Sequence, residues 1–186
     1  MLLGEAKEYV RRIYEGFEDA GYYCQHWLLD AQKMGVPQRR ERVFFVCLRK
    51  DLAAPFLVMQ DLFNEVPKLD LDFNEPPIMF GEVADYSGRE INSRVMRLLW
   101  DNRKDGDSNQ GDANERLFGK GSNFNQAYVY PDNICPTLAS KESCLIHFVQ
   151  PKFLAKSEVC CISSFPQDYN FGGQSPIMCA ECPCHP

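Results

Sequence analysis

Three arginines crowd the segment Gly35 to Val46, which reads GVPQRRERVFFV. They follow a loop built on glycine and proline and precede the apolar run Val43 to Leu48. A guanidinium offers five N–H donors in a planar fork that matches a phosphate or a base carbonyl. The pattern is typical of a phosphate or base site at the mouth of a strand, or of a solvated run of charge, and composition alone favours the second.

The elements that must position these arginines can be read from periodicity. Residues 2–20 carry apolar side chains at steps of three and four, which predicts an amphipathic helix that ends at Gly21. Two strand-like runs follow, Tyr22 to Leu29 and Arg42 to Leu48. The second run is continuously apolar, as expected of a strand covered on both faces, so we expect part of an α/β sheet.

The middle of the chain changes character. It is rich in proline and acidic residues, and one amphipathic helix is predicted at about Arg89 to Trp100. The stretch from Asn102 to Asn125 is polar and rich in Gly, Asn and Asp, which predicts a long loop that either serves a function or is disordered. A last short helix is predicted over 154–162, ended by Phe165-Pro166.

Length and composition limit the class of protein. The 186 residues suggest about one domain, and no apolar run approaches a membrane span. The net charge of −6 divides into +2 for residues 1–50, −7 for 51–134 and −1 for 135–186, so only a local basic cluster could bind nucleic acid. Nine cysteines, an odd number without a signal peptide, favour free thiols and a cytoplasmic location.

Three motifs in a fixed order resemble the DNA (cytosine-5) methyltransferases. In that family a Gln-x-Arg-x-Arg motif follows Gly-Val-Pro, as in Gly35 to Arg42 here. Asn133 to Leu138 (NICPTL) resembles the family's Pro-Thr element. The run from Phe153 to Tyr169 resembles its late motif, which runs Leu-Thr-x-x-Glu, then an arginine, then Phe-Pro-Asp-x-Tyr. The resemblance covers most of the chain, but only the C-terminal half of the family.

The resemblance implies a fold and a division of the chain. Residues 1–50 would form the edge of a Rossmann-like, S-adenosylmethionine-dependent methyltransferase sheet, and residues 51–150 a small mixed α+β target-recognition domain. Residues 151–176 would carry the late motif, and 177–186 a separate tail. Because other strands of such a sheet are missing from this sequence, apolar surface on 1–50 should be exposed.

The resemblance also implies DNA handling without complete catalytic machinery. The family adds a cysteine thiolate to cytosine C6 and transfers a methyl group from S-adenosylmethionine to C5 of the flipped-out base. Its Pro-Cys loop, Glu-Asn-Val motif and glycine-rich cofactor motif are absent from these residues. We therefore assign no catalytic, cofactor-binding or metal-binding residue in this chain, and its activity as an enzyme stays uncertain. Cys24 and Cys47 are expected to be buried and inert.

Site residues follow from the motifs. By resemblance, Arg42 would lie near the flipped cytosine and its phosphate, Arg40 would brace the catalytic loop, and Gln38 would orient the strand edge. Arginine reads guanine and Asn or Gln reads adenine, so polar residues of the long loop are candidates for target recognition unless that loop is simply disordered. The candidates are Arg103, Lys104, Asn109, Gln110, Arg116, Lys120, Asn123 and Asn125.

The late motif and the tail depart from the family. Ala155 stands where threonine is usual, and Cys161 where an arginine helps to join the two domains. Cys179, Cys182, Cys184 and His185 allow a zinc site, which adjacent ligands at a chain end make unfavourable. One allowed coding of 177–185, read in a shifted frame, spells Gly-Met-Ser-Val-Pro-Pro, the family's final Gly-x-Ser-Val-Pro-Pro motif. We therefore expect a frameshifted tail.

The sequence thus predicts a truncated, by itself inactive copy of a bacterial or phage DNA (cytosine-5) methyltransferase that binds double-stranded DNA. The alternative is a non-catalytic DNA-binding or complementing module that works with a separate N-terminal methyltransferase chain. Methyl transfer, measured alone and with such a chain, separates the two. No membrane partner is expected, and the target DNA sequence is left open.

Overall fold

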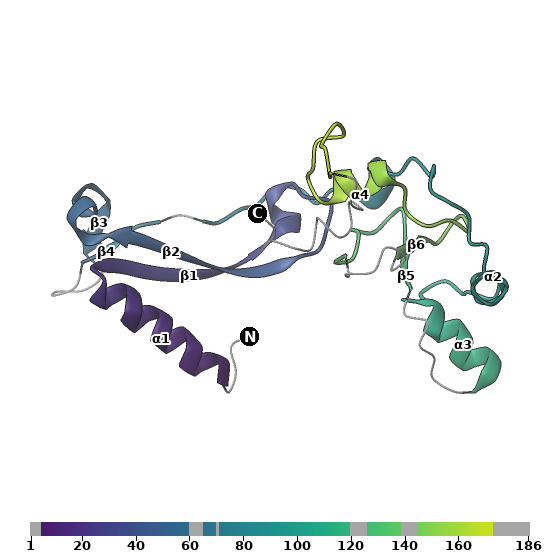
Figure 1. Cartoon of the computed structure of the whole chain (residues 1–186), viewed down its shortest axis with the longest axis horizontal. Coiled ribbons are helices and arrows are strands. Elements are labelled where there is room, and N and C mark those ends of the chain that lie inside the picture. Colours follow the sequence, from purple (N-terminus) through teal and green to yellow (C-terminus); the bar gives the residue numbers. More distant parts are fainter. Residues whose placement is uncertain (1–4, 60–64, 70, 120–125, 139–144, 173–186) are drawn as a thin grey trace. The chain divides into compact units, whose positions relative to one another are not determined.

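The structure is a computed structural model that describes residues 5–59, 65–69, 71–119, 126–138 and 145–172 (Figure 1). It divides into two compact units, and each is described separately below. The first holds residues up to Leu29 and from Glu41 to Phe73, and the second holds Asp30–Arg40 and the chain from Asn74 onward.

In its described residues the first unit contains one α-helix, two pairs of strands and two short 3-10 turns (Figure 1). The predicted helix is confirmed as α1, and Gly21 ends it with a φ of +81°, a conformation that glycine adopts without strain. Both predicted strands are also confirmed, as the neighbouring β1 and β2. The bounds are α1 (Glu5–Asp19), β1 (Tyr22–Asp30), β2 (Glu41–Arg49), β3 (Leu57–Met59) and β4 (Glu65–Pro67), the last two antiparallel.

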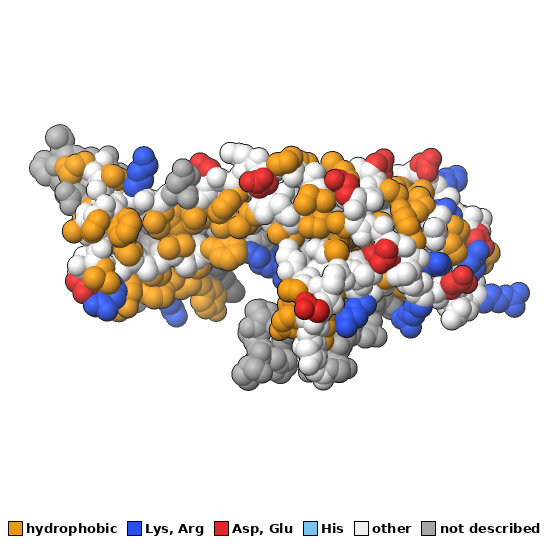
Figure 2. Space-filling view, turned by 90° about the horizontal axis from the view of Figure 1, so that it is seen from above, with side chains coloured by type: hydrophobic (Ala, Val, Ile, Leu, Met, Phe, Trp, Pro, Cys, Tyr) orange, Lys and Arg blue, Asp and Glu red, His pale blue; other side chains and the backbone are white. Residues whose placement is uncertain are grey.

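The strand β2 is not covered on both faces, so that prediction is wrong for the described chain. Val43 is 37% exposed and Phe44 is 49% exposed, and Leu28 on β1 is 55% exposed. Among the described residues, α1 packs against one side of the strand pair, where the Tyr14 ring of α1 contacts the Phe45 ring of β2. Apolar side chains are accordingly visible over the part that carries β1 and β2 (Figure 2), and the predicted exposure of apolar surface is confirmed.

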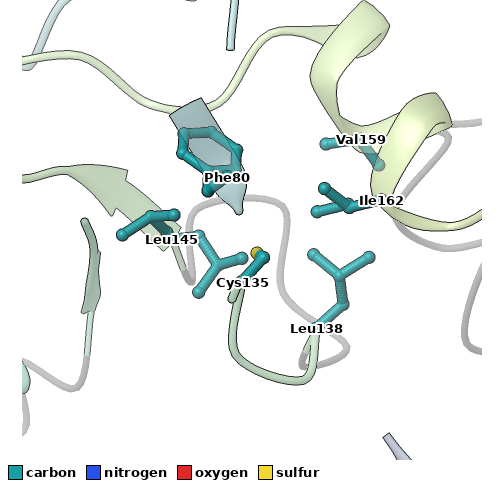
Figure 3. Close-up of a cluster of buried hydrophobic side chains, with 7 residues drawn as sticks. Phe80, Cys135, Leu138, Leu145, Val159 and Ile162 are labelled. Atoms are coloured by element: carbon teal, nitrogen blue, oxygen red, sulfur yellow. The ribbon is translucent and has the colours of Figure 1, made fainter. Parts of the chain in front are cut away.

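The second unit is built around a short parallel pair of strands. Its elements are α2 (Arg94–Asp101), α3 (Gln110–Phe118), β5 (Ala127–Val129), β6 (Leu145–His147) and α4 (Lys156–Ile162). Side chains alternate across a strand, so this pair separates two hydrophobic clusters. One contains Phe80, Val129, Cys135, Leu138, Leu145, Val159 and Ile162 (Figure 3). The other contains Ile91, Trp100, Tyr128, Ile146 and Phe153.

Helix α2 begins later than predicted because tertiary pairing takes the residues before it. The Ile91 N–H donates to Pro151 O at 2.9 Å, and the Phe153 N–H donates to Arg89 O at 2.9 Å. Residues 89–91 are therefore held extended against 151–153, and Ile91 is buried there. The Ser93 side chain then caps the helix by accepting the Met96 N–H.

The predicted long loop from Asn102 to Asn125 contains a helix, α3, so a loop throughout is wrong. Asn109 caps it by accepting the Gly111 N–H at 2.7 Å, and Asp112 reaches back to the Asn109 N–H at 3.2 Å. Gly119 ends the helix with a φ of +65°. These capping residues, Asn109 and Asp112 at the spacing of a capping box, were the available sequence signal for this helix. The predicted helix at 154–162 is confirmed as α4.

Candidate functional site

The Gln38 segment lies against the other two motifs inside the second unit. Gln38 is 3% exposed, pairs with Cys135 in a β-bridge and donates from Nε2 to Ile162 O at 3.3 Å. The Arg39 N–H donates to Cys135 O at 2.9 Å, and the Thr137 hydroxyl donates to Arg39 O. Hydrogen bonds thus join the Gln38 segment to two motifs that lie 98 and 124 residues further along the chain.

Local sequence explains how the chain turns into this segment. Asp30 accepts the Gln32 N–H at 3.2 Å and starts a short 3-10 turn over Ala31–Met34. Gly35, with a φ of +75°, ends the turn. Pro37 is buried and has no N–H group, so its burial next to the Gln38 bridge leaves no backbone donor without a hydrogen-bond partner.

A pocket of about 220 Å³ opens beside this junction. It is lined by Val36, Gln38, Arg40, Ile162, Ser163 and Ser164. Its one charged lining side chain is Arg40, and Ser163 and Ser164 supply hydroxyls, so it suits a small polar or anionic group. It does not suit S-adenosylmethionine, because a cofactor of that size needs more volume and the lining has no carboxylate for the ribose hydroxyls.

Arg42 belongs to the first unit, at the beginning of β2. Its side chain is exposed, and Nη1 donates to the neighbouring Glu41 O at 2.7 Å. A guanidinium with one backbone contact keeps donors for a phosphate. The role predicted for Arg42 in base and phosphate binding, like those of Arg40 and Gln38, stays a prediction.

Glu158, at the start of α4, organises the surroundings of the late motif. The sequence analysis did not predict this role of Glu158. Its carboxylate is fully buried and accepts four N–H groups. Oε1 accepts from the backbone of Asp85 and Tyr86 at 3.0 and 3.1 Å. Oε2 accepts from the Ala155 N–H at 2.6 Å and from His147 Nε2 at 3.1 Å. The glutamate three residues after a helix N-cap was the signal for the Ala155 bond, whereas the others need the fold.

The electrostatics of Glu158 follow from these contacts. Burial by itself raises the pKa of a carboxylate, but the bonds from His147 and from the backbone of Ala155 outweigh it, so the pKa of Glu158 is lowered. The rings of Phe80 and Tyr86 pack on His147, at centroid distances of 5.5 and 4.9 Å. The carboxylate therefore stays charged and ties α4, β6 and the segment 85–86 together.

Several predicted target-recognition residues take part in the fold. The guanidinium carbon of Arg103 lies 3.4 Å from the centroid of the Trp100 ring, and this side chain donates to the carbonyls of Phe148 and Trp100. Gln110 is fully buried and donates to Met96 O at 2.8 Å. Such contacts position α2 and α3, so these particular donors serve the fold rather than a base.

The other candidates differ in accessibility. Arg116 forms a bidentate pair with Asp107, with two bonds of 2.6 Å, and this guanidinium holds the pKa of Asp107 below its usual value. Asn109 caps α3, whereas the Lys104 side chain is exposed. Lys120, Asn123 and Asn125 lie outside the described residues. As a set, these residues stay a prediction for DNA recognition.

Within residues 5–59, 65–69, 71–119, 126–138 and 145–172, no cluster of three or more His, Cys, Asp or Glu side chains is arranged to hold a metal ion. In the same residues no helix is both long and apolar enough to cross a bilayer. The tail 177–186, with its cysteines and the predicted frameshift, lies outside the described residues.

Comparisons with known proteins place the chain in a family. The family profile for C-5 cytosine-specific DNA methylases matches residues 1–182. The type II methyltransferase M.DdeI of Desulfomicrobium norvegicum is 29% identical over 223 residues, 95% of this chain and 52% of that protein. M.NgoFVII of Neisseria gonorrhoeae is 25% identical over 190 residues, 94% of this chain and 49% of that protein. The chain thus spans about half the length of these curated relatives.

Solved structures show the same fold over most of the chain. DNMT2 of Spodoptera frugiperda superposes with a TM-score of 0.58 at 14% identity, covering 96% of this chain and 58% of that chain. The methyltransferase EhMeth of Entamoeba histolytica gives 0.56 at 12% identity, covering 95% and 54%. The fold is thus the mixed α/β fold of the DNA methyltransferases. The chain belongs to the C-5 cytosine-specific DNA methylase family, which confirms the resemblance seen in its motifs.

Proposed function

We propose that these 186 residues supply the DNA-contacting part of a type II DNA (cytosine-5) methyltransferase. The observation that supports this best is the junction of the three family motifs. Gln38 is hydrogen-bonded to the end of α4, and the neighbouring Arg39 backbone is hydrogen-bonded to Cys135 and Thr137. Such a junction keeps Arg40 at a defined pocket, as a base or phosphate site requires.

Binding to double-stranded DNA would depend on a few cations. The stretch 51–134 carries a net charge of −7, so it opposes a phosphate backbone as a whole. Arg42 and Lys104 are exposed, and Arg40 lines the pocket. We expect Arg40 and Arg42 to contact phosphates, with Lys104 as the most accessible of the described target-recognition candidates.

Catalysis would require groups that these residues do not contain. In the family S-adenosylmethionine supplies the methyl group, and a cysteine loop supplies the nucleophile. Neither the Pro-Cys loop nor the glycine-rich motif occurs before the tail, and the Arg40 pocket does not fit the cofactor. We therefore propose that the chain by itself transfers no methyl group, as expected of an inactive partial copy.

A specific observation favours the alternative, a complementing module. Leu28, Val43 and Phe44 on the β1–β2 pair are exposed apolar side chains. An N-terminal methyltransferase chain with the remaining strands of the sheet would cover such side chains and add the cofactor site. In that case the chain would act in a two-chain enzyme rather than alone.

The experiment measures DNA binding and methyl transfer on the same preparation. Fluorescence anisotropy with a labelled duplex is recorded at several salt concentrations for the wild type, Arg42→Ala and Arg49→Ala. Arg49 is a matched control, because it ends the same strand and is paired with Asp51. Loss of one phosphate contact should weaken the binding of Arg42→Ala and flatten its slope against log salt by about 0.9, with Arg49→Ala unchanged.

Two outcomes contradict the proposal. Equal affinities and slopes for all three proteins would remove Arg42 from the DNA site. Incorporation of tritiated methyl groups into the duplex by the pure chain would show that it is catalytic alone. Incorporation only after addition of an N-terminal methyltransferase chain would select the complementing module.

A further inference from the structure

The strand pair β1–β2 brings two cysteines together in the first unit. Cys24 lies on β1 and Cys47 on β2, and their Sγ atoms are 3.4 Å apart, with the Cys47 thiol donating to Cys24. Both side chains are half-buried, so the prediction that they are buried and inert is wrong on burial. Two neighbouring strands place only directly opposite side chains so close.

Backbone register explains the contact. The Lys50 N–H donates to Gly21 O at 2.9 Å, which pairs these residues at one end of the antiparallel hairpin. Counting inward places Cys24 opposite Cys47 and His26 opposite Phe45, whose rings lie 5.7 Å apart. Hydrogen-bonded and non-hydrogen-bonded pairs alternate along an antiparallel hairpin, and Cys24 lies three residues after Gly21. Cys24 and Cys47 therefore form a non-hydrogen-bonded pair, in which the Cα atoms are about 4.5 Å apart. That separation lies in the range that disulfides span.

We propose that Cys24 and Cys47 form a reversible dithiol–disulfide site that a low-molecular-weight disulfide, such as oxidised glutathione, converts between its two states. The reaction needs only rotation of the two side chains, because the strands already hold the cysteines in register. The inference is independent of DNA binding and would hold if the proposed function failed.

The chemistry balances as two thiol–disulfide exchanges. One cysteine thiolate attacks a sulfur of oxidised glutathione, the S–S bond breaks, and one glutathione leaves as the thiolate. The second cysteine thiolate then attacks the mixed disulfide and releases the second glutathione. Two electrons pass from the protein to glutathione, and the two cysteine protons end on the two released thiols.

The surroundings set the rate of this exchange. Burial and the neighbouring Cys47 raise the pKa of Cys24 to about 11, so its thiolate is scarce at neutral pH. Tyr14 faces the same side of the hairpin, and its hydroxyl lies 2.7 Å from His26 Nδ1. Because the Cys24 thiolate is scarce at neutral pH, the reaction should be slow there and faster in mildly alkaline buffer.

A consequence for stability follows from chain topology. A Cys24–Cys47 bond would close a covalent ring that contains residues 31–40, the segment that joins β1 to β2 and carries Gln38 and Arg40. Closing a loop of this size removes freedom from the unfolded chain, so oxidation should raise the melting temperature by about 10 °C.

The test is disulfide mapping on the full chain. The protein is equilibrated in mildly alkaline buffer at graded ratios of oxidised to reduced glutathione, remaining thiols are alkylated, and the digest is analysed without reduction. A peptide pair that joins Cys24 to Cys47 should accumulate, disappear on later reduction and be at least tenfold more abundant than in urea-unfolded protein. Cys24→Ser and Cys47→Ser should each abolish it.

The unfolded sample is the essential control, because seven other cysteines could pair at random. Circular dichroism confirms that the native samples are folded before and after oxidation. If Cys24 and Cys47 are alkylated separately at every glutathione ratio, or if their linked peptide is no more abundant in folded than in unfolded protein, the proposal is wrong.

Discussion

Replacing the buried Glu158 by glutamine should destabilise the second unit strongly. The carboxylate accepts two bonds on each oxygen, and glutamine keeps one oxygen and turns the other into an NH₂ group. That group would face two N–H donors in a site with no exposure to solvent. The side-chain volume hardly changes, so the loss reports hydrogen bonding and charge rather than a cavity.

The size of the effect follows from the number of lost bonds. A hydrogen bond to a charged group contributes about 1.5–3 kcal/mol, and two of four are lost. We expect Glu158→Gln to lower the free energy of unfolding by about 3–5 kcal/mol, a large part of the usual total.

The assay is urea unfolding followed by the fluorescence of Trp100. This indole is buried and donates to His147 O at 2.9 Å, so it reports on the Glu158 site. Trp27 is the other tryptophan of the chain, and Trp27→Phe in every sample leaves Trp100 as the only one. Glu115→Gln is the matched control, since Glu115 is exposed on α3 and should change stability by less than about 0.5 kcal/mol.

The pH dependence gives a second, independent check. Because the pKa of Glu158 is lowered in the folded state, its contribution is fully present well above the ordinary value of 4.5 and is lost as the pH falls through the folded pKa. The stability gap between wild type and Glu158→Gln should therefore shrink in acid. A gap below about 1 kcal/mol at neutral pH, or an equal loss in Glu115→Gln, would refute the role of this carboxylate.

Three further substitutions test the packing of the second unit. Gly88→Ala should lower the free energy of unfolding in urea by about 3 kcal/mol, because a Cβ there would lie 1.9 Å from Phe153 O. Gly16→Ala is the control and should not destabilise the protein, because a Cβ at that position in α1 meets open space. Ala155→Ser should raise stability by about 1 kcal/mol by completing the capping box with Glu158, and an unchanged midpoint would count against a cap at this position. Arg116→Met should lower stability by about 2 kcal/mol, since it leaves the buried Asp107 without its cation, and Arg94→Met should not.

Local pattern was sufficient for much of the chain. The helix α1 follows from apolar side chains at steps of three and four, and the strands β1 and β2 follow from short strand-like runs. The short α4 was likewise predicted from its own residues, so each of these elements is defined by a few neighbouring side chains. The three motifs were sufficient to identify the family, because residue types at set spacings can be recognised in the sequence without knowledge of the fold. A capping pair at Asn109 and Asp112 held enough information for α3, although the polar composition around it suggested a loop.

Only the tertiary structure decided what individual side chains do. Gln110 and Arg103 resemble base-reading residues in sequence, yet one is buried and the other is stacked on Trp100. The late start of α2, the open face of β2 and the contact between Cys24 and Cys47 depend on segments distant in the chain. The physical reason is that burial and hydrogen-bond partners are set by which segments meet, whereas periodicity and capping depend only on residues within a turn or two.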